Sequence, residues 1–514
     1  MGDLPGEGTS MTRRTMIAGA AAAGGLAAAP ALAATKAAPG AGHPLDTHDA
    51  LGLAELVRTR QVSPLELLDA AIGRAEALDP RLHFMAQRHY DYGRAAIANG
   101  LPQGPFRGVP WLLKDLNTYI AGLPTGNGSR FFKDYRPDVT SELVRRIEKA
   151  GFVVFGKTAV PELGLTGTTE NQVTGATRNP WNPEHIAGGS SGGAAVAVAS
   201  GVIPAAHATD GGGSIRIPAS CCGLFGLKPS RGRVPMGPPR TEGWGGLSVH
   251  HAVTRSVRDS AAILDVTHGV EPGSRYSAPT PYETFLAHVT KAPGKLRIAL
   301  MLDAPSRAPI DPECRDAALA AARLCESLGH TVVEAAPKLD VAALGAAGFA
   351  LIASSVAADM LDRAKATGIP VGPDVLEPIT LAFVEMGQHV TGMDYVRANN
   401  ALQAAALTMA QFMADYDMIL SPTLAAPPLE LGKINLTPGV DFAAWGARAA
   451  AFSPFTQVEN MTGQPAMSVP LGMSKAGLPI GVMFVGRYGD EAGLLRLAGQ
   501  LEQAAPWKDR RPHV

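Results

Sequence analysis

The chain has 514 residues, of which 46% are hydrophobic and 18% are charged, so it can bury a large core. Its 45 basic and 46 acidic residues give a net charge of -1, which supplies no general attraction to nucleic acid, an anionic membrane or a polyanionic substrate. We therefore expect a globular protein, monomeric or homodimeric, that acts on a small and largely uncharged molecule without a nucleic-acid or membrane partner.

The N-terminus carries a candidate export signal over residues 1–33. Arg13 and Arg14 precede an alanine-rich apolar run, and residues 31–33 (A-L-A) are small enough for cleavage by a signal peptidase. The run is short and rich in alanine and glycine, which is marginal for a transmembrane helix. We interpret the segment as a twin-arginine signal, so the mature protein is expected to begin near Ala34 and to be periplasmic or secreted. A disordered tail is the alternative.

The chain after this signal is predicted to form a linker and one domain. Residues 34–44 are rich in alanine, glycine and proline and predict the linker, and the domain covers 45–514. Helical spacing of apolar residues predicts helices over 51–77, broken where Ser63-Pro64 begins a new helix. The portion from about 341 to 416 is also predicted to be rich in helix.

Short apolar runs alternate with helical stretches through the rest of the domain. Helices are predicted over 141–150 and 312–328. Strands are predicted at 109–113, 152–155, 296–300, 331–333, 418–420 and 480–484. This alternation indicates an α/β core. No segment after the N-terminus is expected to resemble a membrane span.

The four cysteines predict neither a metal site nor a redox motif, because they lack CxxC spacing and an accompanying histidine cluster. We expect them to be buried and reduced, and we expect no metal ion and no cofactor. They are Cys221, Cys222, Cys314 and Cys325.

The stretch 151–158, G-F-V-V-F-G-K-T, matches the spelling of a phosphate-binding P-loop. Such a loop must be exposed and flexible between its glycines, whereas Phe-Val-Val-Phe favours a buried strand. We therefore do not expect nucleotide binding at this segment.

The stretch 188–192, G-G-S-S-G, matches the nucleophile elbow of α/β-hydrolases, in which Ser190 would be the attacking residue. That elbow requires a strand immediately before it. The preceding stretch, 179–185, holds two prolines and is typical of a loop, although 194–200 has a helical pattern. From these residues alone, a nucleophilic Ser190 and a flexible Gly/Ser connector both stay open.

The stretch 210–218, D-G-G-G-S-I-R-I-P, offers a second candidate serine, Ser214. The three glycines before it can present successive backbone N–H groups toward one point, because no Cβ obstructs the unusual dihedral angles that such a concavity demands. We predict an oxyanion hole formed by Gly211, Gly212, Gly213 and Ser214, whose donors commonly change a rate by about 10² to 10³ each. A structural glycine-rich turn is the alternative.

Taken together, these motifs resemble those of the amidase-signature family of serine hydrolases. The matching stretches cover nearly the whole chain after the signal and lie at 113–115, 188–193, 210–216, 223–229 and 463–466. Two further stretches, 175–181 and 505–507, resemble in particular the branch that hydrolyses the 6-aminohexanoate cyclic dimer. The resemblance implies a single α/β domain with a large mixed, mainly parallel β-sheet covered by helices on both faces.

The resemblance also implies a Ser-Ser-Lys triad. Ser214 attacks the carbonyl carbon, Lys114 is the base, and Ser190 carries the proton between them and later to the leaving amine. A lysine normally titrates near about 10.4, so a neutral base requires a pKa lowered by roughly 3 units, which burial beside the apolar run 109–113 would provide. The family pattern further implies a cis peptide between Gly189 and Ser190.

Three charged residues near these motifs are expected to orient the catalytic groups. They are Asp115, Asp210 and Arg216, and for Asp115 and Arg216 a plain ion pair is the alternative. His207 is not required by this chemistry and is expected to be structural.

The expected activity is hydrolysis of the C–N bond of a small, largely uncharged amide, cyclic or linear and aliphatic, through an acyl-enzyme. A carbamate or ester hydrolase, similar to a urethanase, is the alternative, because the same triad forms the same acyl-enzyme from each substrate. A non-catalytic or amidotransferase-subunit role fits less well, since the export signal and the near-zero net charge argue against work on cytoplasmic aminoacyl-tRNA.

Overall fold

The computed structural model describes residues 42–437 and 439–514, so the predicted signal over 1–33 and most of the predicted linker lie outside the described residues. The first described helix begins at Pro44, and residues from His43 to Val514 form one unit. Within this unit the long predicted helical region 51–77 is two helices. The second of them starts where predicted, because Ser63 accepts the N–H of Glu66 and the Glu66 side chain accepts the N–H of Ser63 in a capping box.

The core is an eight-stranded mixed sheet with the strand order β10-β9-β11-β13-β12-β7-β8-β6. Strand β9 pairs in parallel with β10 and β11, whereas the remaining neighbours pair antiparallel. The strands are β6 (Ala205–Asp210), β7 (Phe225–Lys228), β8 (Val249–Thr254), β9 (Arg297–Leu300), β10 (Thr331–Glu334), β11 (Met418–Pro422), β12 (Ala466–Met473) and β13 (Pro479–Gly486).

A mixed sheet was predicted and is confirmed, but the expectation that it is mainly parallel is wrong. Parallel neighbours need a long crossover, whereas β12 and β13 are joined only by the turn at 474–478. A connection of that length permits an antiparallel pair, and the hydrogen bond from the Ser474 N–H to the Leu478 carbonyl (2.8 Å) closes it.

A separate three-stranded sheet, in the order β1-β3-β2, lies beside the large one and carries the base candidate. Its strands are β1 (Met85–Arg88), β2 (Pro110–Lys114) and β3 (Val153–Thr158). Strand β3 is buried along its whole length, as predicted for the P-loop-like stretch. A short hairpin pairs β4 (Glu170–Asn171) with β5 (Gly175–Ala176).

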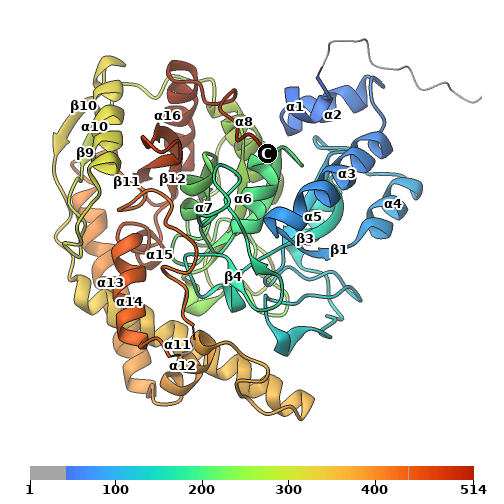
Figure 1. The fold of residues 1–514 in the computed structure, drawn as a ribbon. Helices are drawn as coiled ribbons and strands as arrows, with labels where there is room; N and C mark the ends of the chain where they lie inside the picture. The colour runs from blue at the N-terminus through green and yellow to red at the C-terminus, as the bar shows by residue number, and fades with distance from the viewer. Residues whose placement is uncertain (1–41, 438) are drawn as a thin grey trace, which may run out of the picture. The chain divides into compact units, whose positions relative to one another are not determined.

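The helices occupy the connections between these strands (Figure 1). They are α1 (Pro44–Thr47), α2 (Ala50–Arg58), α3 (Pro64–Leu82), α4 (Tyr90–Ala98), α5 (Glu142–Lys149), α6 (Gly192–Ala199), α7 (Arg216–Cys222), α8 (Val257–Thr267), α9 (Phe285–His288), α10 (Pro312–Ser327), α11 (Val341–Thr367), α12 (Pro378–Gly387), α13 (Gly392–Phe412), α14 (Phe442–Phe452), α15 (Val458–Thr462) and α16 (Glu491–Ala504). The predicted helix-rich portion, about 341–416, is thus α11 to α13, which gather with α14 at one end of the domain in Figure 1.

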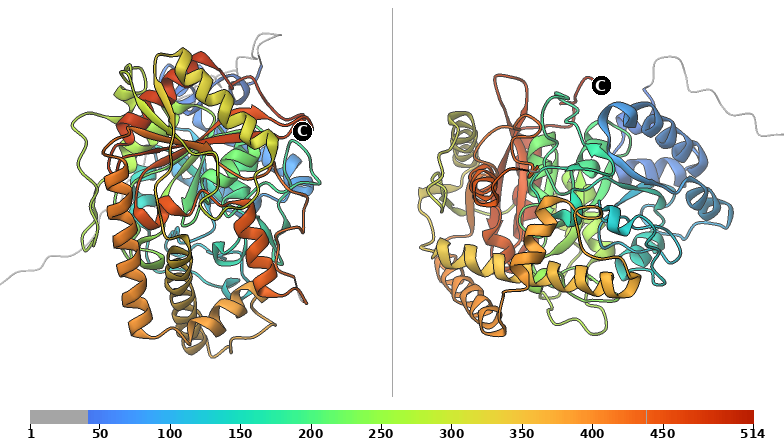
Figure 2. Two further views of the ribbon diagram at one scale, coloured as in Figure 1. Left: turned by 90° about the vertical axis from the view of Figure 1, so that its left-hand side faces the viewer. Right: turned by 60° about the horizontal axis from the view of Figure 1, so that its bottom comes forward.

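Helices cover both faces of the large sheet, as predicted. Successive side chains of a strand point to opposite faces. On β9, Ile298 and Leu300 belong to the hydrophobic cluster that includes α10 and α16, whereas Ala299 belongs to a second cluster with Met409 of α13 and Val458 of α15. The views in Figure 2 show the sheet between these helices.

Helix α11 departs from one expectation. Among the described residues it is the helix long and apolar enough to cross a membrane by length and composition alone, and 39% of its most apolar window is buried. The prediction that no later segment has this character is therefore wrong. Two faces of α11 pack inside the domain, with Leu351 against the cluster of Leu402 from α13 and Val356 in the cluster of Ile379 from α12.

Candidate active site

Lys114 is the last residue of β2, and its side chain is completely buried. Its Nζ lies 2.7 Å from Ser190 Oγ and 2.7 Å from Thr209 Oγ1. No carboxylate among the described residues forms an ion pair with it. Burial lowers the pKa of Lys114 well below its ordinary value, and the more distant Asp210 carboxylate opposes this only in part. The lowered pKa favours the neutral amine, which can accept a proton from a hydroxyl.

This burial also affects stability. Between the lowered pKa of folded Lys114 and the ordinary lysine value, the unfolded chain binds a proton that the folded protein does not. The free energy of unfolding consequently rises with pH in that window.

A pair of buried histidines fixes the backbone of Lys114. The Lys114 N–H donates to His207 Nδ1 (3.1 Å), and His207 Nε2 lies 2.9 Å from His250 Nδ1. Since His207 Nδ1 accepts, Nε2 carries the hydrogen and donates it to His250. Burial is the main cause that lowers the pKa of both rings, that of His250 to about 3. His207 is thus neutral and structural, as predicted, but it contacts the base residue directly.

Ser190 lies on a loop and not at the end of a strand. Residues 179–191 contain no strand of the large sheet, and α6 begins at Gly192, so the nucleophile elbow is not built here. The Gly189–Ser190 peptide is cis, as predicted. Ser190 is 2% exposed. The next residue ties this loop to the end of β6, because Ser191 Oγ donates to the Thr209 carbonyl (3.2 Å) and accepts the Thr209 N–H (3.3 Å).

The glycine-rich loop that holds Ser214 follows β6 directly and is shaped by Asp210. The Asp210 carboxylate accepts the N–H groups of Gly213 (2.7 Å) and Ile215 (3.2 Å), which flank Ser214. Burial acts to raise the pKa of Asp210, but Arg216, Lys228 and Asn460 together outweigh it and hold the pKa at about 2. Asp210 is therefore a permanent anion that fixes the backbone on both sides of the serine.

This geometry corrects the prediction for Gly213. Its N–H already donates to a charged carboxylate, so it does not serve as a free oxyanion donor. Within the described part of the chain, the N–H groups of Gly211, Gly212 and Ser214 donate no hydrogen bond. Gly213 is instead needed because no other residue fits this position. Its φ is +128°, and a Cβ there would come within 2.3 Å of Thr456 Oγ1.

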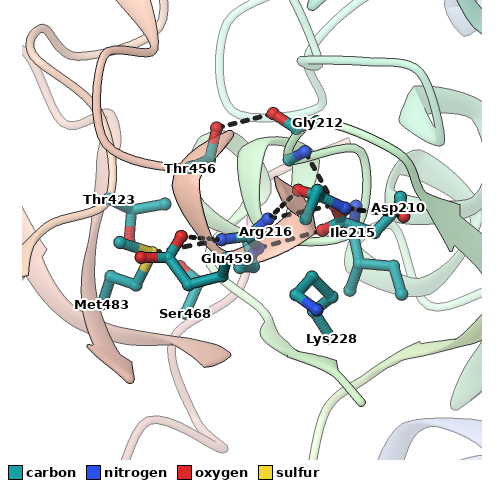
Figure 3. Close-up of polar contacts among 12 residues, drawn as sticks. Asp210, Gly212, Ile215, Arg216, Lys228, Thr423, Thr456, Glu459, Ser468 and Met483 are labelled. Atoms are coloured by element: carbon teal, nitrogen blue, oxygen red, sulfur yellow. Dashed lines mark hydrogen bonds and ion pairs between the residues drawn. The ribbon is translucent and has the colours of Figure 1, made fainter. Parts of the chain in front are cut away.

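Arg216 orients the loop through Asp210, and among the described residues no hydrogen bond joins it to Ser190 or Ser214. Figure 3 shows Arg216 between Asp210 and Glu459. Its Nε and Nη2 donate to the two Asp210 oxygens (3.0 Å each), and its Nη1 donates to Glu459 (2.8 Å). Asn460 adds a donor to the Asp210 carboxylate (2.9 Å). The side chain of Arg216 is completely buried, so this network anchors the loop to α15.

Asp115 does not join the catalytic group. Its carboxylate accepts the Gly126 N–H (3.1 Å) and lies 3.8 Å from Lys157 Nζ. Lys157 in turn donates to the Thr118 carbonyl (2.9 Å). The alternative reading of Asp115, a buried ion pair, therefore describes the structure better than a role in orienting Lys114.

Ser214 differs from Ser190 in its surroundings. Ser214 is partly exposed, and its hydroxyl makes no hydrogen bond to another described side chain, whereas Ser190 is nearly inaccessible and contacts Lys114. Catalytic hydrogen bonds commonly tighten only when substrate is bound. Ser214 is thus accessible to a substrate and lies beside free backbone donors. Ser190 is buried and lies beside an amine that can accept its proton.

Three residues of this site were not predicted, namely Thr209, Glu459 and Asn460. Thr209 has a sequence signal, because His207 and Thr209 are two positions apart on a strand and therefore face the same side, toward Lys114. The α15 residues have none, since only the folded chain brings them to Asp210. The four cysteines are free and buried, as predicted. Among the described residues, no group of three or more His, Cys, Asp or Glu side chains could hold a metal ion.

Comparison with known proteins agrees with the motifs. The family model described as Amidase matches residues 66–495. The 6-aminohexanoate-cyclic-dimer hydrolase of Paenarthrobacter ureafaciens is 38% identical over 481 residues, which cover 91% of this chain and 96% of that protein. A solved structure of 6-aminohexanoate cyclic dimer hydrolase superposes with a TM-score of 0.86 at 37% identity, over 91% of this chain and 98% of that chain. The structure of a bacterial aryl acylamidase superposes with a TM-score of 0.82 at 29% identity, over 92% of this chain and 100% of that chain. The chain therefore belongs to the amidase-signature family and is a hydrolase of amide C–N bonds.

Proposed function

We propose that this enzyme cleaves a small, largely uncharged aliphatic amide, cyclic or linear, through a Ser-Ser-Lys triad of Ser214, Ser190 and Lys114. The observation that carries the proposal is the 2.7 Å contact between the buried Lys114 amine and Ser190 Oγ, beside the loop that presents Ser214. An alcohol is a weak nucleophile at neutral pH and needs a base. A neutral lysine supplies one.

The first half of the reaction forms an acyl-enzyme. Ser190 gives its hydroxyl proton to Lys114 Nζ and takes the proton of Ser214 as Ser214 Oγ bonds to the carbonyl carbon. The carbonyl oxygen becomes negative and accepts hydrogen bonds from the free backbone donors of the glycine-rich loop, Gly211, Gly212 and Ser214.

The second half breaks the C–N bond and then releases the acid. The tetrahedral intermediate collapses while the proton held by Lys114 returns through Ser190 to the departing nitrogen, which leaves as a neutral amine. Water then attacks the ester of Ser214 with the same proton route in reverse. Ser190 thus acts twice as a proton bridge, for which its burial against Lys114 is suited.

The substrate class is supported by the relatives, whose names include a hydrolase of a cyclic aliphatic amide and an acylamidase. A panel of substrates assayed at equal concentrations tests this. We expect the highest kcat/KM for the 6-aminohexanoate cyclic dimer or a linear aliphatic amide, and lower values for an anilide, a peptide C-terminal amide, a carbamate and an ester. Ser214→Ala protein provides the background. Selective turnover of the carbamate or the ester would contradict the amide assignment and favour the alternative with the same triad.

We further propose that the protein is exported through its twin-arginine segment. The change of Arg13 and Arg14 to lysine is expected to retain the protein in the cytoplasm, because the arginine pair is the recognised feature of such a signal. Cell fractionation and N-terminal sequencing measure this, and wild-type exported material should begin at Ala34. Exported protein that still begins at Met1 or Met11 would refute the proposal.

A further inference from the structure

Two large apolar residues are held in a strained backbone conformation, and each lies next to a part of the candidate active site. Among the described residues, seven that are not glycine have a positive φ, and of these only Leu163 (φ 52°) and Trp244 (φ 51°) are large and apolar. A bulky residue rarely adopts this left-handed conformation, so it persists only where the surrounding contacts impose it. The contacts of these two residues therefore indicate what the strain maintains.

Trp244 packs on the first glycine of the glycine-rich loop. A Cβ at Gly211 would lie 2.8 Å from both Cε3 and Cζ3 of the Trp244 ring, and 3.0 Å from Ser248 Oγ. The ring thus lies directly against the residue that supplies one of the free backbone donors. Trp244 is also partly exposed, so part of the indole is accessible beside these donors.

A short turn and the helix-rich portion hold the indole in this place. The turn Trp244–Gly246 is closed by the Ser248 N–H, which donates to the Gly243 carbonyl (3.2 Å). The Trp244 side chain packs against the hydrophobic cluster that contains Leu351 of α11. Helix α11 therefore supports the ring, although it supplies no residue of the proposed triad.

The next position of the glycine-rich loop borders open space. Apart from its chain neighbours, a Cβ at Gly212 would have only Gln457 Cγ within 4 Å in the described part of the chain, at 3.6 Å. Gly212 and Ser214 are partly exposed, and Gln457 is exposed. A substrate carbonyl that reaches the free N–H groups of the loop enters from this open side and so comes next to the Trp244 ring.

Leu163 belongs to a segment that packs on the bridging serine instead. It precedes Gly164, where a Cβ would lie 3.2 Å from Ser190 Oγ, and its N–H donates to the Asn127 carbonyl (2.9 Å). In the proposed reaction Ser190 returns a proton to the departing nitrogen, so the leaving group must lie within hydrogen-bond reach of Ser190. The acyl chain is on the other side of the carbonyl carbon, which leaves the accessible indole as its neighbour.

We propose that Trp244 is a specificity-determining residue, whose ring forms the apolar wall for the acyl chain of the substrate. The inference rests on the proposed function and names the part of the amide that the enzyme selects. Each methylene group that leaves water for such a surface strengthens binding, and an indole offers a large one. The enzyme therefore favours amides of longer aliphatic acids.

Primary amides of different acyl length test the proposal. The wild-type kcat/KM is expected to rise about tenfold from butanamide to hexanamide, as for two buried methylene groups. This ratio should fall to about one in Trp244→Ala, which lacks the wall, whereas Trp244→Phe keeps a ring and should retain most of the preference. Tyr282→Ala removes a fully exposed aromatic side chain and is the control, with the wild-type ratio expected.

A second pair of substrates lengthens the leaving amine and not the acyl chain. N-methylacetamide and N-propylacetamide should give the same kcat/KM ratio in the wild-type enzyme and in Trp244→Ala. An altered ratio would place the ring at the leaving group and overturn the proposal. An equal loss for butanamide and hexanamide in Trp244→Ala would also overturn it, because the ring would then only support the loop.

Equal kcat/KM for butanamide and hexanamide in the wild-type enzyme would refute the acyl wall, while their hydrolysis still supports the proposed function. Should neither be hydrolysed, the proposed function fails, and tryptophan fluorescence with hexanoate decides the contact alone. This measurement also serves if Trp244→Ala does not fold. Hexanoate should change the emission of the wild-type protein but not that of Trp244→Phe. The same change in both proteins, or none in either, would refute the contact.

Discussion

Ser214→Ala is expected to abolish covalent labelling by a serine-directed phosphonate, whereas Ser190→Ala should only slow it. The label bonds to the serine that attacks, and Ser214 is the accessible one, while Ser190 is 2% exposed and contacts Lys114. Amide turnover by Ser214→Ala should fall by a factor on the order of 10⁶, since a missing nucleophile cannot be replaced by other members of the unit. Mass spectrometry of the labelled peptide and steady-state kinetics measure both effects.

Two controls accompany this result, namely a variant of an exposed serine and a measurement of folding. Ser327→Ala, on the exposed end of α10, should label like the wild-type enzyme. Thermal unfolding should show that Ser190→Ala remains folded. Label on Ser190 in the wild-type enzyme would contradict the assignment and restore the nucleophile-elbow reading of 188–192.

Those parts of the fold that rest on local patterns could be predicted from the sequence. Apolar runs identified β2, β3, β9 and β13, and the cap at Ser63 identified the start of α3. Strands β6 and β8 were not predicted. Their sequences, A-A-H-A-T-D and V-H-H-A-V-T, lack apolar continuity, yet every residue in both is buried. Their polar side chains are tolerated inside because partners such as the His207–His250 pair satisfy them.

Strand direction was the feature least accessible to sequence reasoning. The alternation of strands and helices suggested parallel pairing, but two strands adjacent in the sheet need not be adjacent in the chain. Strand β11 pairs antiparallel with β13, from which it is separated by α14, α15 and β12. Such pairing depends on long-range packing, which a local pattern does not encode.

Only part of the candidate site could be predicted from the sequence. The motifs predict the residue types of the triad and of the glycine-rich loop, and the contact between Lys114 and Ser190 agrees with them. The hydrogen bond from the Gly213 N–H to Asp210 could not be predicted, because Arg216 and Asn460, the latter from a distant helix, hold that carboxylate in place. The partner of Asp115 was likewise set by Lys157 on the neighbouring strand.

Removal of the base is expected to lower amide turnover about as strongly as removal of the nucleophile. Lys114→Ala, and Lys114→Met, which keeps most of the side-chain volume, should both lose amide turnover, because neither attack nor protonation of the leaving amine is then assisted. Activated esters should be affected less, since their leaving groups depart without a proton. The exposed Lys133→Ala is the matched control and should retain wild-type rates for both substrates.

The pH profile of amide hydrolysis is a second test of Lys114 as the base. Burial lowers the pKa of Lys114, and only the neutral amine accepts the serine proton, so kcat/KM should be constant above the lowered pKa and fall by about tenfold per pH unit below it. His207 and His250 are neutral over this range, because burial holds their pKa values below the ordinary histidine value, so they do not produce the transition. Asp210 stays ionised down to about pH 2 and keeps the loop in place throughout. A flat amide profile from pH 9 to pH 5, together with near-normal amide turnover in Lys114→Met, would show that Lys114 is not the base.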